Sequence, residues 1–67
     1  MIIKLSRHAE EKMIERGVSM KEIEKAIQSG SKFMQKPDKV VAEYRYFSVV
    51  YKKLNEIYYI ITVQPRW

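Results

Sequence analysis

The chain has 67 residues, a formal net charge of +5 and no cysteine. A chain of this length supplies one small domain with a thin core, so we expect a single domain over residues 1–67. The lack of cysteine excludes disulfides and thiolate metal sites, and one histidine disfavours an all-protein zinc site, so we expect no metal and no cofactor. No apolar run approaches the roughly 20 residues of a membrane span, and Lys4 and Arg7 interrupt the N-terminus, so we expect a cytoplasmic protein without membrane contact.

The first part of the chain carries the signals of a short strand followed by a helix. Residues 1–5 are an apolar lead-in with the character of a strand fragment. Ser6 stands at the N-cap of a helix predicted over residues 7–16, because its hydroxyl can accept a hydrogen bond from the first turn. Gly17 supplies the left-handed conformation that ends such a helix.

A second helix follows almost without a connection. Ser19 and Glu22 have the spacing of a capping box, which predicts a helix over residues 20–29 that ends before Gly30. Because so few residues join the two helices, we expect an αα-hairpin with both apolar stripes turned to a common side. The stripes contain few apolar residues, so the hairpin needs a sheet to cover it.

The rest of the chain is rich in β-branched and aromatic residues, which favour strands. We predict strands over residues 31–35, 40–46, 48–54 and 57–63, with turns at residues 36–39 and 54–56 and a break between strands around Phe47 and Ser48. The last run is apolar at nearly every position, so we expect it to be central in the sheet. The expected fold is α+β, with the two-helix hairpin packed on an antiparallel three- to four-stranded sheet.

The spacing of apolar residues also predicts the core. Strict alternation in the last strand would place Ile57, Tyr59, Ile61 and Val63 on one face. With the helix stripes and one residue of the preceding strand, the expected core residues are Ala9, Met13, Ile23, Ala26, Ile27, Val50, Tyr59, Ile61 and Val63.

Positive charge and aromatic residues are concentrated in the second half of the chain. Residues 31–67 carry seven Lys or Arg against three Asp or Glu, and they contain all eight aromatic residues. A basic aromatic surface fits a polyanion with bases that can stack, which is a nucleic acid. The same composition also suits ordinary strands, because tyrosine favours strands and lysine protects sheet edges.

The only histidine, His8, lies on the first predicted helix with Lys12 and Arg16 at intervals of four residues. Three basic side chains along one helix edge could grip a phosphate, and a histidine could transfer a proton near neutral pH. The alternative is structural: His8 borders the core, Lys12 lays its stem along it, and Arg16 pairs with glutamates of the same helix. The residues alone favour this structural interpretation.

A resemblance to known domains is carried by the pairs His8-Ala9 and Lys12-Met13, the run Arg16-Gly17-Val18-Ser19 and a late strand ending Ile61-Thr62-Val63. With these segments, the chain resembles a small family of prokaryotic domains of unassigned function. Its signature is roughly HA…RM…RG(I/V)S with a late ITV strand, and the resemblance extends from Ser6 to Pro65. That family is similar to the RelE/ParE-type toxins, and it is placed with them in the barnase–EndoU–colicin–RelE superfamily of metal-independent ribonucleases.

The resemblance implies roles for the matching residues. The expected catalytic residues are His8 as an acid/base group, Arg16 as a phosphate binder or structural anchor, and Thr62 as a partner of the phosphate or of the histidine. Lys12 departs from the family, which more often has arginine there, so an ammonium replaces a bidentate guanidinium. The expected RNA-binding residues are Lys12, Arg45, Lys52, Lys53, Tyr58 and Arg66.

The resemblance therefore implies an RNA-binding, toxin-like protein of RelE-like fold whose partners are RNA, including ribosome-associated RNA, and an antitoxin protein. If the protein is an enzyme, it is a metal-independent endoribonuclease in which His8 serves as base or acid and a second group takes the other role. Two alternatives stay open: a non-catalytic nucleic-acid-binding module, and an interaction module that forms a homodimer through an exposed strand or through Ile14.

Overall fold

Both helices lie at the predicted bounds. In the computed structural model, which describes residues 1–66, α1 spans Arg7–Arg16 and α2 spans Met20–Ser29. The Ser6 hydroxyl accepts a hydrogen bond from the Ala9 N–H at 3.0 Å, and Gly17 is left-handed with a φ of 67°. The capping box that opens α2 is complete. The local cap signals therefore set the ends of both helices.

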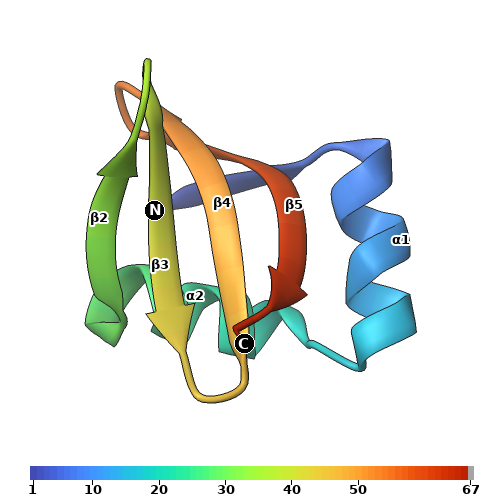
Figure 1. The fold of residues 1–67 in the computed structure, drawn as a ribbon. Coiled ribbons are helices and arrows are strands. Elements are labelled where there is room, and N and C mark those ends of the chain that lie inside the picture. The colour runs from blue at the N-terminus through green and yellow to red at the C-terminus, as the bar shows by residue number, and fades with distance from the viewer. Residues whose placement is uncertain (67) are drawn as a thin grey trace.

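Within residues 1–66, five strands form one mixed sheet in the order β1-β5-β4-β3-β2 (Figure 1). The strands are β1 Ile2–Leu5, β2 Ser31–Gln35, β3 Lys39–Tyr44, β4 Phe47–Leu54 and β5 Ile57–Pro65. β1 pairs with β5 in parallel, and the other neighbours are antiparallel. The expectation of an antiparallel three- to four-stranded sheet is wrong, because the apolar lead-in adds a fifth, parallel strand.

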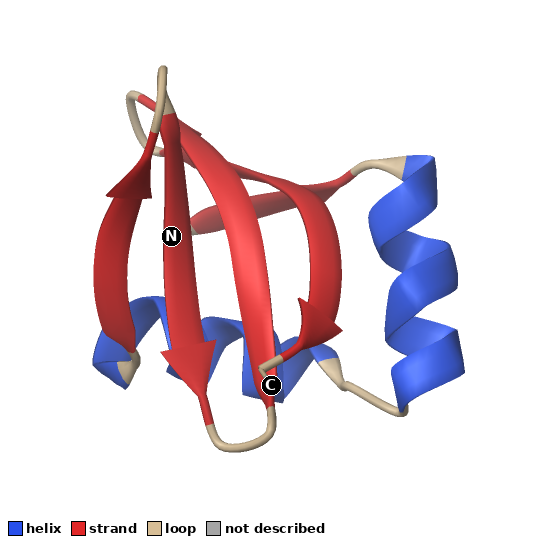
Figure 2. Ribbon diagram, in the orientation of Figure 1, coloured by secondary structure: helices blue, strands red, loops and turns tan. Residues whose placement is uncertain are grey.

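The expected two-helix hairpin is wrong as well, although the fold is α+β. Figures 1 and 2 show α2 running across one side of β3 and β4, whereas α1 stands beside β5. The Ser6 N–H donates to the Ile60 carbonyl at 3.0 Å, and the Ser6 hydroxyl donates to the Ile61 carbonyl at 2.9 Å. These bonds fix the start of α1 to the sheet, so α1 packs along β5 and not along α2.

The core lies between α2, α1 and the side of the sheet that α2 covers, which we call the inner face. Phe47, Ile23 and Ile60 are its largest fully buried side chains. Phe47 follows the Arg45–Tyr46 turn and begins β4, so it belongs to the core and not to a break between strands. The buried cluster contains Ala9, Val18, Ile23, Ala26, Ile27, Ala42, Phe47, Val49, Tyr51, Ile60 and Val63.

A bulge in β5 changes which side chains reach this core. Val50 pairs with Thr62 and Tyr51 pairs with Ile60, so Ile61 has no partner of its own in β4. Ile60 is fully buried, whereas Tyr59 is 38% exposed and Ile61 is only partly buried. The predicted alternation of β5 is wrong at this point, because one extra residue moves the first half of the strand to the opposite face.

Candidate nucleic-acid interface

The outer face of the sheet, opposite α2, carries a row of side chains across four strands. Phe33 on β2 pairs with Val41, Val41 pairs with Val50, and Val50 pairs with Thr62 on β5. Val41 and Val50 are 3% and 4% exposed, so the middle of this row is buried. Phe33 is 50% exposed, which leaves an accessible aromatic ring at the β2 end.

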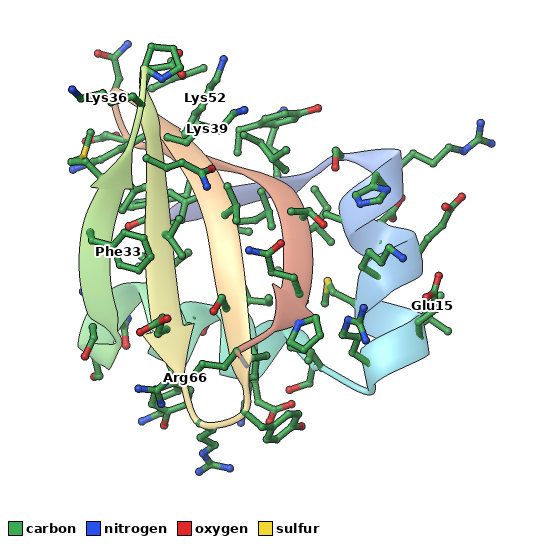
Figure 3. The ribbon with its side chains drawn as sticks, in the orientation of Figure 1. Glu15, Phe33, Lys36, Lys39, Lys52 and Arg66 are labelled. Atoms are coloured by element: carbon green, nitrogen blue, oxygen red, sulfur yellow. The ribbon has the colours of Figure 1, made fainter. Side chains whose placement is uncertain are left out.

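A second row on the outer face is basic. Lys52 pairs with Tyr59, and Tyr59 pairs with Lys4 on β1. Lys39 immediately precedes Val40, the partner of Tyr51, so it continues the row beyond Lys52. Figure 3 shows Lys39 and Lys52 near each other, at the end of the sheet that holds the β2–β3 turn. Three ammonium groups and a partly exposed tyrosine thus share one line across the sheet.

One carboxylate lies close to this basic row. The Asp38 Oδ2 atom is 3.2 Å from the Lys52 Nζ atom, and the side chains are 55% and 38% exposed. A pair in this much solvent contributes at most about 1 kcal/mol and is weakened by salt. An incoming phosphate can therefore take the place of Asp38 beside Lys52 at little cost.

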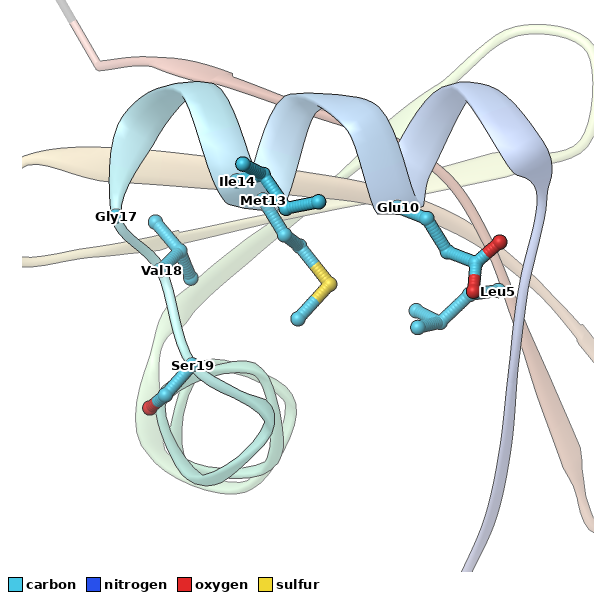
Figure 4. Close-up of a pocket in the computed structure, with 7 residues that line it drawn as sticks. All are labelled: Leu5, Glu10, Met13, Ile14, Gly17, Val18 and Ser19. Carbon is cyan, nitrogen blue, oxygen red and sulfur yellow. The ribbon is translucent and has the colours of Figure 1, made fainter.

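The basic edge of α1 lies on the outer-face side of the molecule. Ala9 is fully buried, and a groove follows one flank of α1, where Figure 4 shows Met13 and Ile14. That groove opens toward the start of α2, which covers the inner face. The helical period places His8, Lys12 and Arg16 along the opposite flank, which adjoins the outer face at β5. We call these three residues the basic flank of α1.

The expected catalytic residues lie on adjacent elements. His8 and Arg16 are exposed on α1, and Thr62 is half-buried on the outer face of β5. The bond from Ser6 to the Ile61 carbonyl brings the first turn of α1 next to the strand that bears Thr62. The Lys12 Nζ atom lies 3.3 Å from a Glu15 carboxylate oxygen. The structural interpretation expected a pair of this kind within the helix, but with Arg16 as the cation.

The two cavities described for residues 1–66 lie elsewhere. The groove beside α1 has a volume of about 410 Å³, and its lining residues are Leu5, Glu10, Met13, Ile14, Gly17, Val18 and Ser19. A second hollow of about 280 Å³ lies at the β4–β5 turn, lined by Met1, Ile2, Lys53, Asn55, Glu56 and Tyr58. His8, Arg16 and Thr62 line neither cavity.

The expected RNA-binding residues fall into separate places. Lys52 is on the outer face and Lys12 is on the basic flank, whereas the other four lie at the two ends of the sheet. Arg45 occupies the β3–β4 turn with a φ of 55°, and its carbonyl accepts a hydrogen bond from Arg66 Nη1 at 3.1 Å. At the opposite end, the Lys53 Nζ atom stands 5.4 Å from the centroid of the Tyr58 ring.

Four residues of the outer face were missed from the sequence. Lys39 could have been found from strand alternation, because it stands two residues before Val41 on the same strand, whereas Phe33 needed the pairing of β2 with β3. Lys4 needed the knowledge that the lead-in is a strand of this sheet, and Tyr59 was assigned to the core because the bulge is not visible in the sequence.

The phenol of Tyr51 is the group whose titration the fold changes most clearly. Burial raises the pKa of Tyr51, and the neighbouring Tyr58 raises it further. Tyr51 belongs to the buried cluster of the inner face, so this shift marks a core residue and not a proton-transfer group at neutral pH. Within residues 1–66, no three His, Asp or Glu side chains gather closely enough to hold a metal ion.

The model of a family described as a domain of unknown function, DUF4258, matches residues 5–65. The chain belongs to this family. The match includes both helices, β2 to β5 and both rows of the outer face except Lys4, which confirms the expected membership of a small uncharacterised domain family. No curated protein and no solved structure matches the chain. Neither helix among the described residues is long and apolar enough to cross a membrane.

Proposed function

We propose that this DUF4258 protein binds single-stranded RNA through the outer face of the sheet and the basic flank of α1. The observation that carries the proposal is the basic row of Lys4, Lys39 and Lys52. Lys4 and Lys52 are the partners of Tyr59 on its two neighbouring strands, and Lys39 pairs with Gln35 on β2, the strand that bears the exposed ring of Phe33. Ammonium groups bind backbone phosphates, and exposed aromatic rings stack on bases. An RNA ligand would place the protein in the cytoplasm.

The arrangement favours a single strand over a duplex. Phe33 and Tyr59 stand on strands three steps apart in the sheet, which is about 14 Å at the usual spacing between strands. Rings that lie on a sheet surface can stack only on bases that are free of a pairing partner. The basic flank of α1 extends the positive surface past β5, so the strand would cross the sheet and continue along the helix.

The test measures RNA affinity as a function of salt. Fluorescence anisotropy of a labelled single-stranded RNA should give an affinity that falls steeply with salt, by a slope of about −0.7 for each phosphate neutralised. The double variant Lys39→Gln with Lys52→Gln removes two such contacts, so its slope should be shallower by about 1.4. Replacing Phe33 or Tyr59 by alanine should weaken binding by about 5- to 150-fold, the usual loss for one stacked base.

A matched variant separates the outer face from net charge. Lys21 and Lys25 are exposed on α2, on the other side of the molecule, so Lys21→Gln with Lys25→Gln removes the same charge. This control should keep the slope of the wild type. Lys53→Gln, near the end of β4, should also have little effect. Equal losses from both double variants, or no binding at low salt, would refute binding through the outer face.

A second candidate function is metal-independent RNA cleavage of the RelE-type toxin kind. The position of His8 on the basic flank, beside the strand of Thr62, favours it, as does the resemblance of residues 8–19 to relatives of these toxins. A base would remove the ribose 2′-hydroxyl proton, and that oxygen would attack the phosphorus. The bond to the 5′-oxygen would then break as an acid protonates it, with Lys12 and Arg16 stabilising the charge.

Cleavage has its own test. The wild type should produce fragments with 2′,3′-cyclic phosphate ends in the presence of a chelator. His8→Ala should abolish this while keeping the melting temperature, because an exposed side chain adds little packing. An antitoxin-like partner would be encoded in a neighbouring reading frame and would copurify with the protein. If the wild type cleaves no RNA, including on ribosomes, RNA binding is the function that stands.

A further inference from the structure

The edge strand β2 is exposed along its whole length. All five of its residues are exposed, and β3 is its one neighbour in the sheet. Phe33 and Met34, on opposite faces of the strand, are 50% and 66% exposed. Proteins usually protect such edges with several charges, a proline or a bulge, but β2 has one charged residue, Lys32, and a regular register with β3. An edge of this kind readily pairs with another strand.

The register shows which main-chain groups of β2 are unpaired. The two-residue turn after β3 closes on the pair Tyr44–Phe47, and such a closing pair exchanges hydrogen bonds with its own hairpin partner. Because bonding alternates along a strand, Val41 and Glu43 direct their main-chain groups toward β2. A Cβ atom at Gly30, next to β2, would stand 2.7 Å from the Glu43 carbonyl oxygen, which agrees with this direction.

The outward groups of β2 follow from this pattern. Phe33 and Ser31 pair with Val41 and Glu43, so their N–H and C=O groups are used within the sheet. The N–H and C=O groups of Lys32 and Met34 therefore point away from the sheet. Two donors and two acceptors stand in line along an edge that nothing among residues 1–66 covers.

We propose that β2 pairs with β2 of a second copy of this chain, antiparallel about a two-fold axis at Phe33. In this register Lys32 faces the partner's Met34, and Met34 faces the partner's Lys32. All four outward groups of each copy are then satisfied by four main-chain hydrogen bonds. Phe33 faces its own copy in a closely spaced non-hydrogen-bonded pair, which favours contact between aromatic rings. The outer faces of both copies join into one surface.

Axes at Lys32, Phe33 and Met34 keep the hydrogen bonds in phase and pair at least three residues of β2 with the partner's β2, whereas axes at Ser31 or Gln35 pair only one. Charge selects among the first three. An axis at Lys32 would place that residue opposite itself, and an axis at Met34 would place Lys32 opposite the partner's Lys36. Like charges directly opposite each other destabilise a pair of strands. An axis that lies between two residues would pair a residue whose main-chain groups point outward with one whose groups are already bonded to β3, so it forms no ladder of hydrogen bonds. Of the three central axes, the one at Phe33 opposes no lysine to another.

The dimer should be weak and should strengthen with salt. Pairing of two short strands buries far less than the roughly 1,200–2,000 Å² of stable complexes, so we expect association in the range of tens to hundreds of micromolar. Each copy carries a net charge of +5, and salt screens the repulsion between copies. RNA binding has the opposite salt dependence, so the two properties can be measured and refuted separately.

Cysteine cross-linking tests the register, since the chain has no cysteine of its own. Phe33→Cys should form a disulfide dimer, because the Cα atoms of a non-hydrogen-bonded pair lie about 4.5 Å apart, within the range that a disulfide spans. Ser31→Cys alone should not form a disulfide dimer. Its two cysteines lie four residues apart along the paired strands, which is about 13 Å. A mixture of Ser31→Cys and Gln35→Cys, which retains Phe33, should form the mixed disulfide. Equal yields from all combinations would overturn the proposal.

A charge exchange at Met34 tests the pairing without cross-links. Sedimentation equilibrium without RNA should show that Met34→Lys weakens the dimer by about 2- to 30-fold, because it opposes two lysine pairs. Met34→Glu should tighten the dimer by a similar factor, because each glutamate would face the partner's Lys32. A wild type that stays monomeric at about 1 mM, or two substitutions that change the dimer in the same direction, would overturn it. A monomeric result would leave an extended peptide of another protein as the occupant of this edge.

Discussion

Ser6 joins three elements, and its replacement tests how α1 is held at the edge of the sheet. Its N–H donates to the Ile60 carbonyl, and its hydroxyl donates to the Ile61 carbonyl while it accepts from the Ala9 N–H. Ser6→Ala keeps the first bond and removes both hydroxyl bonds. The substitution therefore uncaps α1 and frees the bulge of β5 in one step.

The expected loss can be worked out from these two bonds. Removing an N-cap hydroxyl costs about 1 kcal/mol. The Ile61 carbonyl is partly buried at the bulge, and leaving it without a partner adds about 1 kcal/mol. Ser6→Ala should therefore lower the free energy of unfolding by about 2 kcal/mol. In a domain of this size, that corresponds to a melting temperature about 8–16 °C lower.

Two further variants divide this loss into its parts. Ser19→Ala removes the N-cap hydroxyl of α2, which is exposed and bonded only within its own capping box, so it should cost about 1 kcal/mol. Ser6→Asp keeps an N-cap acceptor but cannot donate to Ile61, so it should also lose about 1 kcal/mol. Urea unfolding followed by circular dichroism measures all three. Equal losses for Ser6→Ala and Ser19→Ala would show that the bond to Ile61 adds nothing.

Two other predictions concern the core and the turns. Because burial raises the pKa of Tyr51, the folded chain keeps this proton at pH values where the unfolded chain, with a tyrosine pKa of 10.0, has lost it. Its contribution to stability is therefore complete below about pH 10 and is lost as the pH rises above that value. The urea midpoint of the wild type should fall between about pH 9 and 11, and Tyr51→Phe should show a smaller fall. Equal falls in the wild type and the variant would contradict this. Gly17 has a φ of 67° with nothing within 4 Å of an added Cβ, whereas an added Cβ at Gly30 would lie 2.5 Å from the Ala26 carbonyl oxygen. In thermal unfolding, Gly17→Ala should lower the free energy of unfolding by about 1 kcal/mol, and Gly30→Ala should lower it distinctly more. The reverse order would show that the contact at Gly30 relaxes.

The parts of the fold that depend on neighbouring residues were readable from the sequence. Ser6, Gly17 and Ser19 act on the backbone within one helical turn, so they set the start of both helices and the end of α1. The hairpin strands and their turns are likewise local. By contrast, β1 has four residues, too few to show a period, and its partner begins 55 positions later with Ile57. Nothing in its own composition distinguishes a parallel edge strand from an apolar tail.

The site divides in the same way. The basic flank of α1 follows from helical spacing alone, because a helix of ten residues brings positions four apart onto one side. The rows of the outer face require the register of four strand pairs, which the sequence does not carry. The bulge at Ile61 accepts a hydrogen bond from the Ser6 hydroxyl, 55 positions earlier in the chain, and it reversed the face assigned to Tyr59.

The pairing of β1 with β5 has a consequence for how the chain folds while it is being made. Translation proceeds at about 5–20 residues per second, so Ile2 is added to the chain roughly 3–11 s before its partner Ile57. During that interval α1 can form its turns but has no strand to lie against. The hairpins of β2, β3 and β4 can form as they emerge, whereas the first strand and first helix must wait for the last strand. The final closure of the sheet is therefore a late, long-range event, and the nascent N-terminal segment is the part of the chain most exposed to chaperones and proteases.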